Sequence, residues 1–299
     1  MDNTQKGVLY TALAYLLWGI LPSYWRAVSS FNDYEILFHR IIWSFFFMII
    51  VLAVTKKLSP LVKETKSLFK RKREFIALII ASVVITFNWG IFIWAVNNNH
   101  VLQASLGYYI NPLMSIALGF IFLKERFTRT ETLAILLAAI GVLYMTFSVG
   151  TFPIVSVTLA LSFALYGLMK KVVNINALYS ITLETFFILP IAFLGIAILT
   201  ADQKTYFGNN FESFLILFSG IVTAIPLILF SAGAKRIPLS LVGLLQYISP
   251  TLILLQGVFM FGEPFTLTHA ITFGCIWSGL MIYSLSKWMQ YKKSRKIKL

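Results

Sequence analysis

Long apolar stretches alternate with short polar segments along the whole chain. A helix needs about 20 mostly apolar residues to cross a bilayer, and ten windows of the sequence meet this requirement. They span residues 7–28, 34–55, 74–96, 102–123, 130–148, 153–170, 178–200, 212–233, 240–261 and 267–288. Proline and glycine mark several of their ends. The pattern predicts an all-α integral membrane protein with ten transmembrane helices.

Parts of the first half return in the second half at a constant offset. The sequence YINP at 109–112 reappears as YISP at 247–250, 138 residues later, and the same offset relates Gly141 to Gly279. We therefore predict two five-helix repeats, residues 7–148 and 153–288, followed by a basic cytoplasmic tail, residues 289–299. Because five is odd, the second repeat crosses the membrane in the opposite direction to the first.

Inverted repeats around a central cavity are a common plan of secondary transporters, which expose one site to either face in turn. The sequence thus predicts alternating access. The fifth and tenth windows hold mainly small and aliphatic residues, so we expect these two helices at the periphery of the bundle.

Composition agrees with a membrane protein. Charged residues make up 12% of the chain, against about 25% in soluble proteins. The net charge of +14 does not indicate nucleic-acid binding, because nearly all of the basic residues lie in segments between the apolar windows. The single cysteine, Cys275, excludes an intramolecular disulfide. The first window has no evident cleavage site after it, so we expect it to remain as a span.

The basic residues predict the orientation. With a cytoplasmic N-terminus, 22 of the 25 Lys and Arg residues are cytoplasmic, only Arg26 and Lys204 are external, and Arg40 lies within a window. Cytoplasmic loops are enriched in basic residues, so both termini are predicted to be cytoplasmic. We expect the basic runs at 63–73 and 292–298 to contact anionic membrane lipids and not nucleic acid.

Few charged residues lie inside the windows. Glu35, His39 and Arg40 lie in the second and Glu184 in the seventh. A charge at membrane depth costs roughly 2.5–3.5 kcal/mol, so it usually faces a cavity or a partner. Arg40 either binds an anionic group of a solute or is a structural charge. Glu184 and His39 are likewise functional or structural, and a proton or another ion is an open coupling partner. Glu35 and His39, four residues apart, can form a hydrogen bond.

Amides and aromatic rings gather where the third and fourth windows meet. Asn88, Trp89 and Asn97 precede this point, and Tyr108 and Asn111 follow it. A buried amide without a partner is costly, so Asn88 and Asn111 either bond a neighbouring helix or face a polar cavity. Aromatic rings are also common interfacial anchors, which is the alternative for Tyr108.

Two prolines occupy matching positions within the fourth and ninth windows. Proline removes a backbone donor and kinks a helix, and matching interruptions in two halves point to a central site. We predict helix kinks at Pro112 and Pro250. The predicted substrate pathway comprises Glu35, His39, Arg40, Asn88, Trp89, Asn97, Tyr108, Tyr109, Asn111, Tyr166, Glu184, Gln246 and Tyr247.

Several stretches carry a resemblance to a known family. They are residues 35–44, 88–89, 94–98, 104–112, 163, 166–167, 184, 246–247 and 262–263. These stretches resemble RarD-type permeases of the EamA branch of the drug/metabolite transporter superfamily. The resemblance implies two EamA-type repeats around a central cavity, a place in the bacterial cytoplasmic membrane, and export of a small metabolite or drug-like solute. The family's link to chloramphenicol sensitivity describes a phenotype and does not identify a substrate.

The chain departs from the family pattern at Gln103, where relatives have an acidic residue. If that acid carries protons or binds cations in relatives, this chain lacks the step.

Two other classes of function were weighed against a secondary-active transporter of a small-molecule solute. An enzyme is disfavoured, because the chain has three histidines and no metalloprotease motif, cysteine ligand set or P-loop. We therefore expect no catalytic residues, no metal and no cofactor. The alternative is a non-transporting scaffold or assembly protein, in which neutral substitutions of Arg40 and Glu184 would change stability alone.

Overall fold

The computed structural model describes residues 1–97, 101–149, 154–260 and 265–296. Within these ranges the chain forms thirteen helices and no strand. They are α1 (Asn3–Ala27), α2 (Asp33–Val54), α3 (Leu58–Lys70), α4 (Lys72–Asn97), α5 (Val101–Phe122), α6 (Arg129–Val149), α7 (Ile154–Val172), α8 (Ala177–Ala201), α9 (Phe211–Leu217), α10 (Ser219–Ala234), α11 (Leu239–Gln246), α12 (Ile248–Met260) and α13 (Leu267–Lys296). Each apolar window falls largely on one helix or on two consecutive helices.

Eight helical stretches in the described part of the chain are long and apolar enough to cross a membrane. The pair α9 and α10 forms one of them, the pair α11 and α12 forms another, and α5 contributes a shorter apolar segment. The all-helical architecture is confirmed, whereas the count of ten spans stays a prediction.

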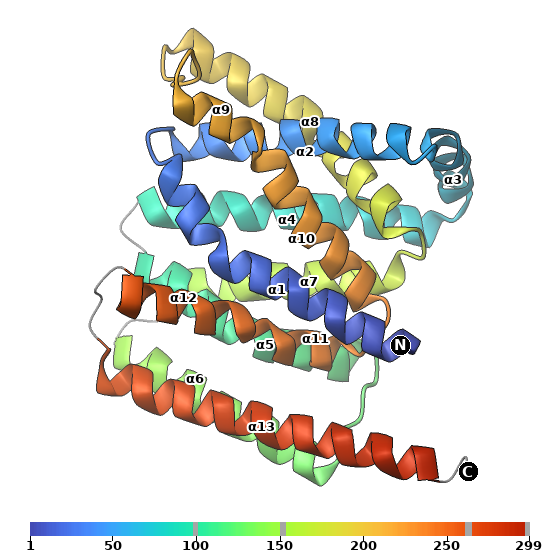
Figure 1. Ribbon diagram of the computed structural model, residues 1–299, viewed down its shortest axis with the longest axis vertical. Coiled ribbons are helices and arrows are strands. Elements are labelled where there is room, and N and C mark those ends of the chain that lie inside the picture. The colour runs from blue at the N-terminus through green and yellow to red at the C-terminus, as the bar shows by residue number, and fades with distance from the viewer. Residues whose placement is uncertain (98–100, 150–153, 261–264, 297–299) are drawn as a thin grey trace.

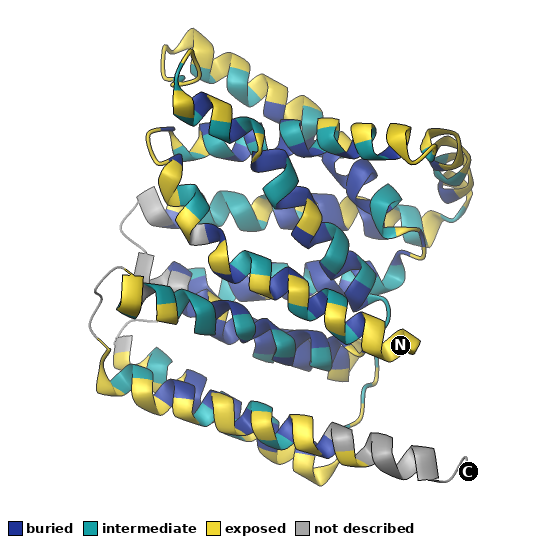
Figure 2. Cartoon of the chain, viewed as in Figure 1, coloured by how far each residue is buried: buried dark blue, intermediate teal, exposed yellow. Residues whose placement is uncertain are grey.

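Large apolar side chains cover the outside of the bundle, in the way expected of a surface in contact with lipid. Phe46, Ile50 and Phe193 are among the exposed examples, and the outward faces of most helices are exposed in Figure 2. Buried residues line the inner faces of the same helices (Figure 2).

The helices pack as a set of layers (Figure 1). α6 packs on α13 at one edge, and α2 packs on α8 toward the opposite edge. Between them, α4 packs on α7 and α1 on α10, while α5 packs on α7 and α11, and α1 on α12. The peripheral position of α6 and α13 agrees with the sequence expectation.

Two glycines at the repeat offset bring α6 and α13 close together. A Cβ atom on Gly141 would lie 2.7 Å from the carbonyl oxygen of Thr272, and one on Gly279 would lie 2.5 Å from that of Ala134. Glycine therefore permits this approach of the two backbones. Ala134 and Thr272 are themselves 138 residues apart. The glycine of each half therefore faces the equivalent residue of the other half.

The basic stretch after α2 contains a helix, α3, that is not among the ten predicted windows. It is an amphipathic helix whose Leu61 and Leu68 are buried in a cluster with side chains of the neighbouring helices, while its lysines are exposed. Arg71 then joins α3 to α4, because its guanidinium pairs with both Glu64 and Glu74.

The two predicted kink sites differ. Tyr247 separates α11 from α12, three residues before Pro250, so the second half contains an interruption. α5 continues as a helix through Pro112, and a bend there stays a prediction.

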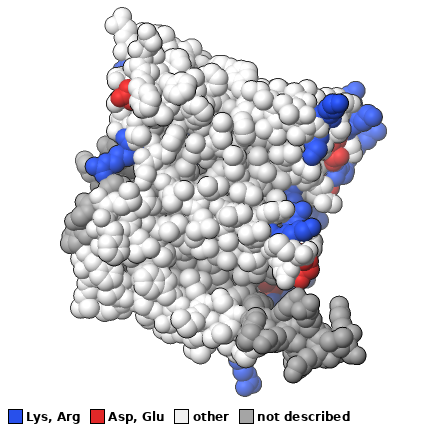
Figure 3. Space-filling model, viewed as in Figure 1, with Lys and Arg blue, Asp and Glu red and all other residues white. Residues whose placement is uncertain are grey.

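Basic side chains gather mostly on one side of the face in Figure 3, the side on which α3 lies. α1 begins and α13 ends on this same side (Figure 1). The last part of α13 extends into the region assigned to a basic tail, so residues 289–296 continue the final helix.

Candidate functional site

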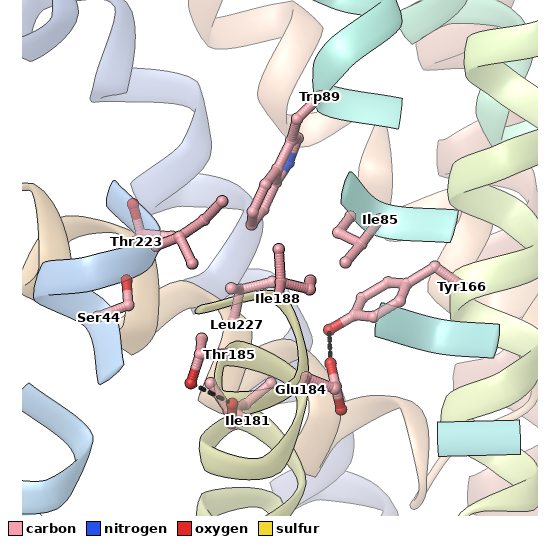
Figure 4. A pocket seen from close by; sticks show the side chains of 11 residues that line it. Ser44, Ile85, Trp89, Tyr166, Ile181, Glu184, Thr185, Ile188, Thr223 and Leu227 are labelled. Atoms are coloured by element: carbon pink, nitrogen blue, oxygen red, sulfur yellow. Dashed lines mark hydrogen bonds between the residues drawn. The ribbon is translucent and has the colours of Figure 1, made fainter. Parts of the chain in front are cut away.

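A small enclosed pocket lies among α2, α4, α7, α8 and α10 (Figure 4). About 20 Å³ of it is free in this conformation, which is room for about one water molecule. Five aliphatic and two aromatic side chains form most of the wall, and Ser44, Thr185, Thr223 and Glu184 add hydroxyl groups and one carboxylate. Three residues of the predicted pathway, Trp89, Tyr166 and Glu184, line this pocket.

Arg40 on α2 lies beside the pocket. Its Nε donates a hydrogen bond to Oγ1 of Thr223 at 3.2 Å, and Thr223 is itself part of the pocket wall. The guanidinium carbon lies 4.7 Å from the ring centre of Trp25 and 4.6 Å from that of Trp89. No carboxylate of the described residues forms an ion pair with Arg40. Aromatic faces thus hold this cation without neutralising its charge.

Glu184 on α8 forms an ion pair with Lys170 on α7. Lys170 is fully buried and also donates to Oγ of Ser180 at 3.0 Å. The hydroxyl of Tyr166 donates to the second carboxylate oxygen at 3.0 Å, and Figure 4 shows this contact across the pocket from Trp89. The sequence analysis counted Lys170 among the cytoplasmic basic residues, and the structure shows its side chain fully buried near the end of α7.

The hydrogen bond suggested between Glu35 and His39 is absent. Nε2 of His39 lies 3.9 Å from Oε1 of Glu35, beyond hydrogen-bond range, and this nitrogen has no hydrogen-bond partner among the described residues. Glu35 instead accepts from the backbone N–H groups of Tyr206 and Phe207 at 2.9 to 3.2 Å. Nδ1 of His39 accepts from the indole N–H of Trp43. Glu35 therefore fastens the connection between α8 and α9 onto α2.

Asn88 and Tyr108 reach different neighbours. Nδ2 of Asn88 donates to the carbonyl oxygen of Leu159 at 2.9 Å and to Oγ of Ser162 at 2.8 Å, so this amide joins α4 to α7. Tyr108 on α5 lies close enough to Arg40 for an electrostatic interaction between their side chains. Tyr108 thus belongs to the surroundings of Arg40, whereas Asn88 serves helix packing.

A second group of predicted residues lies where α5 meets α11 and α12. The hydroxyl of Tyr247 donates to the carbonyl oxygen of Tyr109 at 3.4 Å, which joins two residues related by the repeat offset. Oδ1 of Asn111 and Oε1 of Gln246 are buried and have no hydrogen-bond partner in the described chain. None of these four residues lines the pocket, so they form a group apart from Arg40 and the pocket residues, whereas Glu35, His39 and Asn88 belong to neither group.

Two polar residues of the sequence interpretation cannot be placed in either group. Asn97 ends α4, and its side chain lies outside the described part of the structure, as does that of Gln103.

Sequence reasoning missed three residues that the structure brings to these sites, namely Trp25, Lys170 and Thr223. Lys170 stands four positions after Tyr166, so the two share one face of α7, and that spacing could have indicated it. Trp25 resembles an interfacial anchor at the end of α1, and Thr223 is one of three hydroxyl residues in the otherwise apolar helix α10.

Comparisons with known proteins give a consistent picture. A model of the EamA-like transporter family matches residues 5–147 and 152–285. The chain is 45% identical over 295 residues to "Uncharacterized transporter YojE" of Bacillus subtilis, covering 98% of each protein. It is 42% identical over 283 residues to "Protein RarD" of Escherichia coli, covering 94% of each. A solved crystal structure with 16% identity aligns with a TM-score of 0.73 over 95% of this chain and 99% of that chain, which shows a shared fold.

Proposed function

We propose a function from one established premise: the chain belongs to the EamA-like transporter family. It is a membrane transporter of the drug/metabolite type, as its relatives are. Within this class we propose a secondary-active carrier that exports a small amphipathic solute bearing an anionic group. The single observation that carries this proposal is the uncompensated charge of Arg40 beside an apolar pocket.

The surroundings of Arg40 suit an anion. A charge within a membrane span usually faces a partner or a pathway, and Arg40 has no ion-pair partner among the described residues. A guanidinium presents several N–H donors in one plane and can bind a carboxylate through two of them. Trp89 and Thr223 contact Arg40 and also line the pocket. A solute can therefore place its anionic group at Arg40 and its apolar part in the pocket once the pocket widens.

We propose that the two halves work as inverted repeats and exchange conformations. Reciprocal contacts support this. Gly141 against Thr272 matches Gly279 against Ala134, and the packing of α4 on α7 matches that of α1 on α10. Such a bundle can open its pocket to either side by moving one half against the other.

We also propose that both termini are cytoplasmic and that the membrane is the bacterial cytoplasmic (inner) membrane. The basic side chains gathered on the side of α3 and of both chain ends support this orientation. The relatives named above come from Bacillus subtilis and Escherichia coli.

A thermal-shift screen on the purified protein tests the function. The panel holds amino acids, organic anions, nucleosides and chloramphenicol, each with wild type and with Arg40→Gln. A solute at about 100 times its dissociation constant stabilises by roughly 2.7 kcal/mol, a readily measured shift. We expect organic anions to stabilise wild type, and the shift to fall to about half or less in Arg40→Gln.

The matched control is Arg129→Gln, which removes an exposed arginine at the start of α6. It should respond to the panel like wild type. If no member of the panel stabilises the protein, the carrier proposal loses its support and the scaffold alternative gains. If a solute stabilises wild type and Arg40→Gln equally, Arg40 is not its binding residue.

A further inference from the structure

Lys170 and Glu184 form a buried ion pair inside the bundle. Lys170 is fully buried and Glu184 is 4% exposed. The ammonium of Lys170 donates to Oε1 of Glu184, and Oγ of Ser180 donates to the same oxygen at 2.6 Å. The hydroxyl of Tyr166 donates to Oε2 at 3.0 Å. Three donors therefore hold the carboxylate, and one of them carries a full positive charge.

The positions of these groups follow from helix geometry. Tyr166 and Lys170 are one turn apart on α7, and Ser180 and Glu184 are one turn apart on α8. α7 ends at Val172 and α8 begins at Ala177, so a short connection links the two helices. Both partners thus lie in one half of the chain. When the halves move against each other, this pair can travel as a unit without separating.

Other charged groups lie around the pair. Lys235, which follows α10, interacts electrostatically with Lys170 and Glu184, and also with Glu74 on α4 and with Arg236. Lys235 also donates a hydrogen bond to the carbonyl oxygen of Ile175 in the α7–α8 connection. The ammonium of Lys235 is hydrogen-bonded to this backbone oxygen. Among the described residues, Lys170 is therefore the cation in direct contact with Glu184.

A carboxylate at this depth needs a compensating positive charge. In carriers that couple transport to protons or cations, that charge arrives and leaves with each cycle. In this protein the positive charge is the ammonium group of Lys170, which is a permanent part of the chain. We propose that Lys170 is a built-in counter-ion that keeps Glu184 ionised throughout the cycle, so that Glu184 lines the pocket without taking up a proton. This inference rests on the proposed carrier function and assigns Lys170 a positioning role in it.

Infrared difference spectroscopy of the purified protein in lipid tests this proposal without any solute. A protonated carboxyl group and a carboxylate absorb at different positions, and subtraction of a Glu184→Gln spectrum isolates the signal of Glu184. A carboxyl group buried without a cation can titrate as high as about pH 8 to 9, so spectra are recorded from about pH 4 to 9. For wild type we expect the carboxylate signal at neutral pH and above.

The Lys170→Met variant supplies the opposite case. Its spectrum, minus that of Lys170→Met/Glu184→Gln, should show a protonated carboxyl group at neutral pH, and Lys170→Arg should keep the carboxylate. A protonated Glu184 at neutral pH in wild type overturns the proposal. So does a carboxylate that persists in folded Lys170→Met. If Lys170→Met does not fold, the wild-type difference spectrum decides alone. Because no solute is added, failure here is distinguishable from failure of the solute screen.

Discussion

Arg40→Gln should strongly weaken the binding of an anionic solute and change the stability of the empty protein only a little. In the empty protein, the guanidinium gains about 0.5–2 kcal/mol from each of two indole faces and about 1.5–3 kcal/mol from its hydrogen bond to Thr223. Against this stands the cost of an arginine at membrane depth, roughly 2.5–3.5 kcal/mol. At mid-range values the contacts together gain about 5 kcal/mol and the cost is about 3 kcal/mol, which leaves a net gain of about 2 kcal/mol. We therefore expect the free energy of unfolding of the empty variant to change by no more than about 2 kcal/mol.

Binding of an anionic solute should respond far more strongly. Loss of one charge-assisted hydrogen bond costs about 1.5–3 kcal/mol, so the dissociation constant should rise by about 10- to 100-fold. A solute concentration that stabilises wild type by roughly 2.7 kcal/mol would then stabilise a variant with 100-fold weaker binding by only about 0.4 kcal/mol. Arg40→Lys keeps the charge and loses the planar donor set, so it should lie between wild type and Arg40→Gln.

Unfolding of both proteins in one detergent, followed by helical circular dichroism with and without solute, gives these quantities. Tryptophan fluorescence provides a second readout, because Trp25 and Trp89 contact the guanidinium. The reasoning is refuted if Arg40→Gln lowers the stability of the empty protein by much more than 2 kcal/mol while solute binding is unchanged. That result would assign Arg40 a purely structural role.

Three further predictions concern folding and can be checked by the same unfolding measurement. Gly279→Ala should destabilise by about 1–3 kcal/mol, since its Cβ would meet a carbonyl oxygen at 2.5 Å, whereas Gly274→Ala on the same helix meets open space and should be neutral or stabilising; equal losses would contradict the packing. Lys170→Met should cost about 3–5 kcal/mol, and Lys170→Met/Glu184→Gln much less, because the double variant leaves no buried charge; additive losses would exclude the ion pair. Glu35→Gln should cost about 1.5–3 kcal/mol through its weakened contacts with backbone N–H groups, and should leave the solute response unchanged; an altered response would place Glu35 in the pathway.

The sequence predicted the helices well because the apolar windows are long and their ends are marked by polar residues. Asn32 and Asn176, for example, precede α2 and α8 and accept hydrogen bonds from the first turn of each helix. α3 was missed because its apolar positions are few and are interrupted by lysines. Its amphipathic character becomes visible only when Leu61 and Leu68 are placed on one helical face.

The site was predicted in part. Arg40, Trp89 and Glu184 stand out in sequence as polar or aromatic groups inside apolar windows, and the structure places two of them on the pocket and the third beside it. Their partners could not be deduced in this way. A lysine near the end of a span usually reaches water, so its sequence position did not indicate that Lys170 is buried. Its burial results from the packing of α7 on its neighbours.

Contacts between residues far apart in the chain could not be predicted from the sequence either. Glu35 and His39 are neighbours on one helical face, and local spacing favoured a bond between them. The backbone of Tyr206 and Phe207 competes for the same carboxylate from 171 residues away or more. Such competition depends on the tertiary fold, which hydrophobic periodicity does not determine.

Solute movement across a sealed membrane tests the central claim most directly. The solute that stabilises wild type most in the thermal-shift panel is loaded, unlabelled, into lipid vesicles that contain the purified protein, and uptake of the labelled solute is followed. We predict rapid uptake by wild-type vesicles, slow uptake with Arg40→Gln, and wild-type uptake with Arg129→Gln. Uptake no faster than in protein-free vesicles would contradict the carrier function, and equal uptake by wild type and Arg40→Gln would contradict the binding site.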